Sequence, residues 1–213
     1  MTQHLSDLLE HRQELANAIT HGIGLLLTLV ATPVLLILAV PTATTAQLVG
    51  LAIFCFSMLA VYTSSTIYHA VSEPVTKSIF QQIDHICIYL LIAGTNTPVV
   101  LYFLNNPLGY GYLAIMWTIV LLGTLYKIFF INRLPLLSLT VYTIMGWMGA
   151  LIIYLAWQDM SSHVIWGLVL GGVSYSIGII FYQWERLPYN HAYWHLCVIG
   201  GTVGHYLAVV GMI

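Results

Sequence analysis

The stretch "YNHAYWHLCVIGGTVGH", residues 189–205, combines two features that seldom occur in one segment. From Ala192 onward it belongs to an apolar run long enough to cross a membrane, yet it begins with His191 and His195. Residues four apart in a helix lie one turn apart on the same face. An imidazole at the edge of a bilayer is neither good apolar filler nor a stable charge, so we expect these ring nitrogens to bind something.

The composition of the chain is that of an integral membrane protein. Of its 213 residues, 60% are hydrophobic and only 6% are charged, whereas a soluble domain carries roughly 25% charged residues. The net charge is −2 and no basic patch is present, which argues against nucleic-acid binding. The three cysteines are scattered in apolar segments without a C-x-x-C pair, so they indicate no disulfide framework.

Seven segments are candidates for membrane spans, since a span needs about 20 mostly apolar residues. They are Ile19–Val40, Leu48–Tyr68, Ile86–Leu104, Tyr110–Ile131, Leu134–Trp157, Val164–Tyr182 and Ala192–Ile213. Short links that contain proline, asparagine or aspartate separate most of them. The predicted fold is an all-α membrane protein, a bundle of seven transmembrane helices. Residues 1–18 are predicted to form a cytoplasmic or interfacial segment, and residues 19–213 the transmembrane domain.

The few basic residues predict the orientation of the bundle. They are Arg12, Lys77, Lys127, Arg133 and Arg186. With seven spans, all five fall on one side of the membrane. The positive-inside rule then places the N-terminus in the cytoplasm and the C-terminus outside.

Four predicted helices carry unusual polar residues at this same cytoplasmic end. These are Glu14, Asn17 and His21 in the first helix, Ser65 and His69 in the second, Asp84 at the start of the third, and His191 and His195 at the start of the seventh. Ionisable groups within or at the edge of spans are costly and usually functional. We therefore predict one site built from all four helices.

Three imidazoles and a carboxylate are typical of a zinc site. His191 and His195 would chelate the ion from one helix face, and His69 would supply the third nitrogen. The fourth position would stay open for water, which Asp84 would hydrogen-bond or deprotonate. Ser65 would donate to a substrate carbonyl or position the water. Glu14, Asn17 and His21 would surround the ligands and orient them or a lipid head group.

Other histidines fit an ordinary structural role, because a single histidine at a helix end is more often hydrogen-bonded than a ligand. This interpretation suits His4, His11 and His163. His85 points roughly 100° away from its neighbour Asp84 on a helix, which places it outside the predicted site. His205 shares the face of His191 but lies about 20 Å along the helix, so we expect it to be hydrogen-bonded inside the bundle.

These motifs together resemble the hemolysin III branch of the progestin and adipoQ receptor (PAQR) family. The resemblance rests on three stretches: "ELANAITHGIG" at 14–24, "SSTIYH" at 64–69 with "DHICIYLLIAGTNTP" at 84–98, and "NHAYWH" at 190–195. It implies seven helices with a cytoplasmic N-terminus, and zinc held by His69, His191 and His195. It also implies that Asp84 contacts the zinc through water.

The resemblance extends to function. The family is grouped with alkaline ceramidases, which hydrolyse lipid amides, and its bacterial members are associated with membrane fluidity. It therefore implies a multi-pass protein of the bacterial inner membrane whose substrate or ligand is a membrane lipid.

Three functions follow from these expectations. The first is a zinc-dependent intramembrane hydrolase that cleaves a lipid amide or ester. The second is a non-enzymatic lipid sensor whose zinc is structural, which Asp84 would favour if it bound the metal directly and closed the site. The third is a cytolysin or pore, which ranks last because the polar cluster lies at one end only. A retinal protein is excluded because the last span has no lysine.

Overall fold

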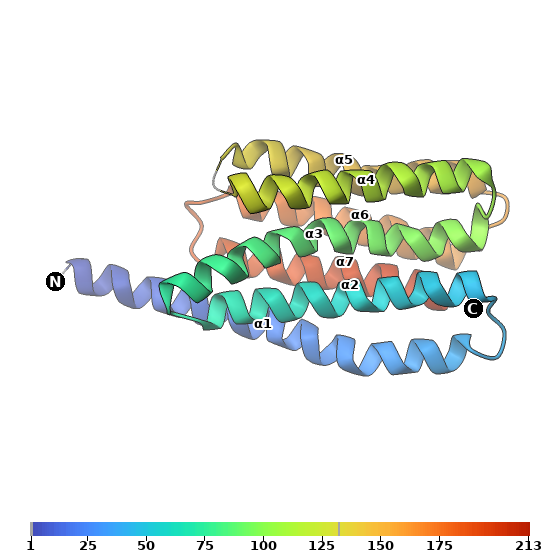
Figure 1. Ribbon diagram of the computed structural model, residues 1–213. Helices are drawn as coiled ribbons and strands as arrows, with labels where there is room; N and C mark the ends of the chain where they lie inside the picture. The colour runs from blue at the N-terminus through green and yellow to red at the C-terminus, as the bar shows by residue number, and fades with distance from the viewer. Residues whose placement is uncertain (1, 132) are drawn as a thin grey trace.

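The computed structural model describes residues 2–131 and 133–213, and this part of the chain is all-helical (Figure 1). Seven helices follow one another along it: α1 (Thr2–Ala39), α2 (Thr45–Ala70), α3 (Pro74–Phe103), α4 (Pro107–Phe130), α5 (Pro135–Ala156), α6 (Ser162–Gln183) and α7 (Asn190–Val210). They lie along one another in a bundle, with the two chain termini at opposite ends (Figure 1). The predicted all-helical class is confirmed.

Six of the described helices, α1 to α6, are long and apolar enough to cross a membrane. The remaining helix, α7, has 21 residues, a sufficient length for a span. Its three imidazoles, its asparagine and its glycines lower its mean hydropathy relative to the others. The membrane character of the chain is thus supported, while the seventh span stays a prediction.

Two helices begin well before the apolar runs that predicted them. Helix α1 is continuous from Thr2 through the segment expected to precede the first span. Helix α3 begins at Pro74, so Asp84 lies inside the helix. We predicted Asp84 at the start of this helix, which is wrong. Polar residues lower the hydropathy of these turns, but they do not interrupt the backbone hydrogen bonds of a helix.

Side-chain caps define several helix starts. The Glu73 carboxylate accepts hydrogen bonds from the backbone nitrogens of Val75 (3.0 Å) and Thr76 (2.7 Å) ahead of α3. Hydrogen bonds from the side chain and backbone of Thr76, and from the backbone of Val75, lower the pKa of this exposed carboxyl. The Asn106 side chain accepts in the same way from Leu108 (3.0 Å) and Gly109 ahead of α4. Such caps satisfy amides that have no partner within the helix.

Helices α6 and α7 approach each other backbone to backbone. A Cβ atom added at Gly204 would lie 2.9 Å from the backbone nitrogen of Gly171, a separation that side chains do not tolerate. A Cβ atom added at Gly201 would lie closer still to the ring of Tyr175. Small residues allow this approach in membrane helices. Gly172, the neighbour of Gly171 in the chain, faces open space instead.

A hydroxyl cluster joins three helices in the middle of the bundle. The Tyr62 hydroxyl of α2 donates to Thr202 Oγ1 of α7 at 2.8 Å, and the Tyr175 hydroxyl of α6 lies 2.8 Å from the same oxygen. Tyr62 also lies edge-on against the ring of His21 from α1, with 5.2 Å between ring centroids. Because α7 is held to α1, α2 and α6 in this way, its N-terminal turn faces α1 and α2.

The five basic residues gather at one end of the bundle, the end of the N-terminus. Arg12 lies in α1, Lys77 near the start of α3, Lys127 near the end of α4, and Arg133 and Arg186 in the links that follow α4 and α6. The three links at this end join α2 to α3, α4 to α5 and α6 to α7 (Figure 1). The links at the other end carry no basic residue in their sequence.

Candidate metal centre

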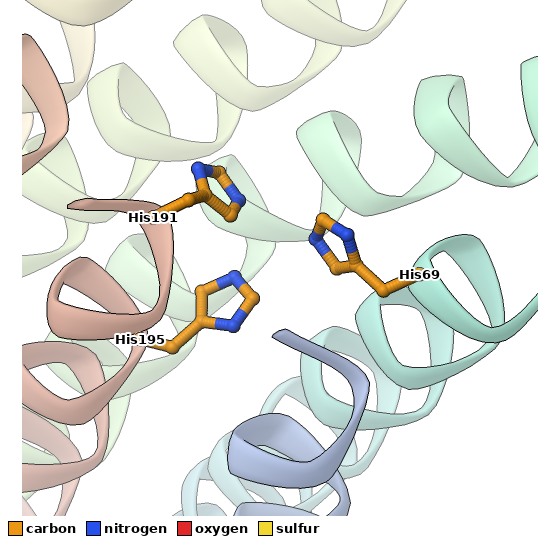
Figure 2. Close-up of side chains that lie close together, drawn as sticks. All are labelled: His69, His191 and His195. Atoms are coloured by element: carbon orange, nitrogen blue, oxygen red, sulfur yellow. The ribbon is translucent and has the colours of Figure 1, made fainter. Parts of the chain in front are cut away.

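Three imidazoles converge at this basic end of the bundle. His69 comes from α2, and His191 and His195 come from the first turns of α7; their rings face a common point (Figure 2). One ligand nitrogen from each lies within 4.8 Å of the others, a group that could hold a metal ion. The ring centroids are 4.5 Å apart for the α7 pair, and 5.0 and 5.1 Å from His69.

The protonation of His69 follows from its contact with α1. Its Nδ1 lies 3.0 Å from Oε2 of Glu14. A carboxylate oxygen accepts hydrogen bonds, so Nδ1 carries the proton and Nε2 is left as the basic nitrogen. This Nε2 is buried and has no hydrogen-bond partner among the described residues. A buried lone pair without a partner is what a metal ligand would show in the absence of its ion.

His195 is held in the same way by the backbone of α1. Its Nδ1 lies 3.2 Å from the carbonyl oxygen of Asn17 and 3.1 Å from Oγ1 of Thr20. The carbonyl can only accept, so Nδ1 is again the donor and Nε2 keeps its lone pair. The ring of His21 stacks on His195 with centroids 3.5 Å apart and planes within 13°. The predicted neighbours from α1 are therefore all in contact with a histidine of the cluster.

Lys77 adds a cation that the sequence did not assign to this site. Its Nζ donates to Glu14 Oε2 at 2.9 Å and to the Tyr68 carbonyl at 3.1 Å. The same carboxylate oxygen thus bridges the imidazole of α2 and the ammonium of α3. Lys77 lies in the first turn of α3, but the apolar run predicted that this span begins only at Ile86. The sequence therefore gave no reason to place Lys77 beside Glu14.

Asp84 and Ser65 are buried side by side with the histidines along one cavity. The cavity has a volume of about 360 Å³, and its lining includes Asp84, Ser65, His21, His191 and His195. Ser65 Oγ is buried without a hydrogen-bond partner in the described part of the chain. The carboxylate and the hydroxyl that we predicted to act on a substrate therefore share a space with two of the three candidate ligands.

A second, polar hollow lies on the N-terminal side of the cluster. It has a volume of about 430 Å³ and is lined by Glu14, Asn17, His69 and His191, with Leu9, Glu10 and Gln13 from the start of α1. His191 lines both spaces. The three imidazoles thus stand between a polar hollow at the end of the bundle and a cavity in its interior.

The positions of two further histidines, His205 and His85, were predicted from the sequence with different success. His205 is not part of the three-histidine group, and its Nε2 lies 3.2 Å from the carbonyl oxygen of Leu168, as expected. It nevertheless lines the interior cavity, and its Nδ1 has no hydrogen-bond partner among the described residues. His85 lines both spaces, although we predicted it to lie outside the site. The cavity is lined by α3 residues 84, 85, 88, 91, 92, 95 and 96. These residues form one broad helical face, and Asp84 and His85 lie on either side of its centre. Both side chains can therefore line the cavity, although they point in directions that differ by roughly 100°.

Comparison with known proteins agrees with this architecture. The family model described as "Haemolysin-III related" matches residues 9–206. The chain belongs to the haemolysin-III-related family. The match confirms the resemblance inferred from the motifs, and it spans all eight predicted site residues.

Two relatives are similar over nearly the whole chain, and a third over about three quarters of it. Hemolysin-3 of Bacillus cereus is 42% identical over 199 residues, which cover 93% of this chain and 91% of that protein. The Hemolysin-3 homolog of Bacillus subtilis is 43% identical, with 93% of each chain covered. The human monocyte to macrophage differentiation factor is 26% identical over 167 residues, 74% of this chain and 67% of its own.

Proposed function

We propose that this haemolysin-III-related protein is a zinc-dependent hydrolase that cleaves an amide or ester bond of a membrane lipid, and that it serves membrane lipid homeostasis, including fluidity. One observation carries the proposal. His69 and His195 each engage Nδ1 in a hydrogen bond and keep Nε2 free beside His191, next to a cavity that contains Asp84. Three protein ligands with an open fourth position are characteristic of catalytic zinc.

His69, His191 and His195 would hold Zn²⁺, which when bound polarises a carbonyl group and makes a nearby water more acidic. Asp84 would accept the proton of the attacking water and return it to the leaving group. The Ser65 hydroxyl, which has no hydrogen-bond partner among the described residues, would donate to the carbonyl oxygen as negative charge develops on it.

The α1 residues would support the ligands without touching the substrate bond. Glu14 and the Asn17 carbonyl hold the Nδ1 protons of His69 and His195, which fixes the tautomers required for metal binding. His21 packs flat against His195 and restricts its ring. These contacts correspond to the outer partners that orient histidine ligands in metal sites.

In the membrane, we propose that α7 forms a seventh span, with Met1 in the cytoplasm and Ile213 outside. The metal centre would then lie on the cytoplasmic side of a bacterial inner membrane. The five basic residues at one end of the bundle support this orientation, and similar proteins occur in Bacillus. Reporter fusions at Ile213 should be active only outside the cytoplasm; cytoplasmic activity would overturn the orientation.

The hydrolase proposal is tested with Asp84→Asn. We expect the variant to keep its zinc and its melting temperature but to lose about 10²–10⁴-fold in rate, the usual contribution of a general base. Zinc is measured by mass spectrometry of the purified protein, and turnover by comparing lipids of cells with and without each variant. Asp159→Asn, in the exposed α5–α6 link, is the matched control.

Two results of this test would contradict the hydrolase. An Asp84→Asn variant with full function, or one that no longer binds zinc, would favour a structural zinc in a non-enzymatic lipid sensor. The name of the Bacillus cereus relative raises lysis as a further alternative. Release of dye from lipid vesicles by the purified protein, at an equal rate with and without zinc, would favour that alternative.

A further inference from the structure

Lys127 differs from the other four basic residues in its burial. Arg12, Arg133 and Arg186 are exposed and Lys77 is half-buried beside Glu14, whereas Lys127 is only 3% exposed. No acidic side chain lies within 4.0 Å of its ammonium group in the described part of the chain. A lysine near a helix end ordinarily extends its charged head into water, whereas little of Lys127 is exposed. A largely buried cation without an ion-pair partner is costly and often marks a functional position in a membrane protein.

Lys127 lines the 360 Å³ cavity that also contains Asp84, His191 and His195. A second donor lines the same cavity from the next helix, α5. Ser138 is also 3% exposed, and its Oγ has no hydrogen-bond partner among the described residues. The nearby hydroxyl of Tyr142 is already used, since it donates to the His85 carbonyl at 2.9 Å. Among the described residues, this wall thus carries one ammonium without an ion-pair partner and one hydroxyl without a hydrogen-bond partner.

The rest of the lining suits a hydrocarbon chain. Aliphatic side chains line part of the cavity, among them Val61, Ile88, Leu91, Leu139 and Ile179. The volume lies within the range of pockets that enclose small molecules. An ammonium group and a hydroxyl donor that line one cavity are together complementary to a carboxylate or phosphate group. The cavity therefore matches an amphiphile with one anionic group.

We propose that Lys127 and Ser138 form a subsite for the anionic oxygen group, a carboxylate or a phosphate, of an acyl lipid bound in the cavity beside the candidate metal centre. The inference rests on the proposed function and narrows it. The substrate class becomes an acyl lipid that carries an acidic group, or the fatty acid that its hydrolysis releases. In the described part of the chain, no hydrogen bond or ion pair joins Lys127 or Ser138 to the three candidate metal ligands, so the subsite and the metal centre can be tested separately.

The test measures binding of three probes to the purified protein in uncharged detergent by calorimetry: oleate, oleoyl lysophosphatidate and oleyl alcohol. We expect wild-type protein to bind at least one anionic probe ten-fold or more tightly than the alcohol. Lys127→Met should abolish that preference and leave alcohol binding unchanged, while Lys127→Arg should retain it. Ser138→Ala should weaken the anion by a few-fold. Arg186→Met, an exposed basic residue at the same end, is the matched control and should bind as wild type.

The outcomes identify the anion and separate this inference from the hydrolase. Stronger binding of oleate indicates a carboxylate, and stronger binding of lysophosphatidate indicates a phosphate head group. Equal affinity of wild type for all three probes, or an undiminished preference in Lys127→Met, would overturn the subsite. If Lys127→Met does not fold, the Ser138→Ala variant provides the test. An affinity of Ser138→Ala for the anionic probe equal to that of wild type would also overturn the subsite. Wild type that prefers anions but holds no zinc would contradict the hydrolase and leave the subsite standing.

Discussion

The two ends of α7 carry the same side chain in different roles. At the N-terminal end, His191 and His195 lie beside His69 of α2. Glu14 contacts Nδ1 of His69 and the Asn17 carbonyl contacts Nδ1 of His195, so the Nε2 atoms of these two rings keep their lone pairs. Further along, His205 faces α6, and its Nε2 is used in a contact with the Leu168 carbonyl. What distinguishes a candidate ligand from a structural histidine here is the neighbouring helix, since both kinds are enclosed by the bundle.

The helices around each histidine explain this difference. Around His205, α6 and α7 are in backbone contact through Gly171 and Gly204, and the ring lies against a carbonyl of α6. At the other end His195 also contacts a backbone carbonyl, that of Asn17 in α1, but there it has His69 and His191 beside it. The candidate ligands therefore differ from His205 in having further imidazoles within reach of one ion.

Removing a ligand should have the largest effect. We expect His69→Ala, His191→Ala and His195→Ala each to lower metal affinity by more than about 100-fold, because the loss of a ligand exceeds the loss of an outer partner. Affinity is measured by competition with a chelator. His205→Ala is the control at the other end of α7 and should keep its metal. Equal losses of metal affinity in all four variants would contradict the proposal that only the N-terminal end of α7 binds metal.

Removing the carboxylate behind His69 should have the next largest effect. Glu14→Gln retains the shape of the side chain but weakens the hydrogen bond that holds His69, so we expect a loss of about 10–100-fold in metal affinity. Glu10→Gln, one turn earlier in the same helix and exposed, is the matched control. Unchanged affinity in Glu14→Gln would show that the carboxylate serves only its ion pair with Lys77.

A change in the close contact between α6 and α7 should affect stability and not metal. Gly204→Ala introduces a methyl group against the backbone of Gly171, and overpacking of this kind costs about 1–3 kcal/mol. We expect a lower melting temperature with one metal still bound per chain. Gly172→Ala, which faces open space, should not be destabilised. A loss of metal in Gly204→Ala would mean that the two ends of α7 are coupled.

The smallest effect is expected at a helix cap far from the cluster. Asn106→Ala removes the side-chain acceptor for two amides at the start of α4, worth about 1 kcal/mol in ordinary helices. Thermal unfolding should register this loss, and chelator competition should not. A shift in metal affinity comparable to that of Glu14→Gln would contradict the assignment of metal binding to one end of the bundle.

The sequence predicted the composition of the cluster better than the extent of its helices. His69, His191 and His195 could be found because helical spacing and a common membrane level both point to them. The first turns of α1 and α3 could not be delimited from hydropathy, since residues such as Glu10 and Gln81 make a segment polar without making it less helical. Helix formation and membrane solubility are separate properties of the same residues.

Contacts between helices were the part that sequence could not supply. Lys77 served only to predict the orientation, and its pairing with Glu14 depends on how α1 crosses α3. Lys127 seemed an ordinary basic residue at a span end, and only the packed bundle shows that it is buried. His85 was excluded by the angle between adjacent residues, but a cavity as wide as this one accepts a broad helical face.

The position of the histidines along the chain sets an order for biosynthesis. His69 belongs to the second helix and His191 and His195 to the last, so most of the chain must be translated and inserted between them. The three imidazoles can meet only after α7 has packed against α1 and α2. Capture of the metal would therefore be the final step of maturation, and a nascent chain that stops before α7 would leave the ribosome with a single one of the three ligands.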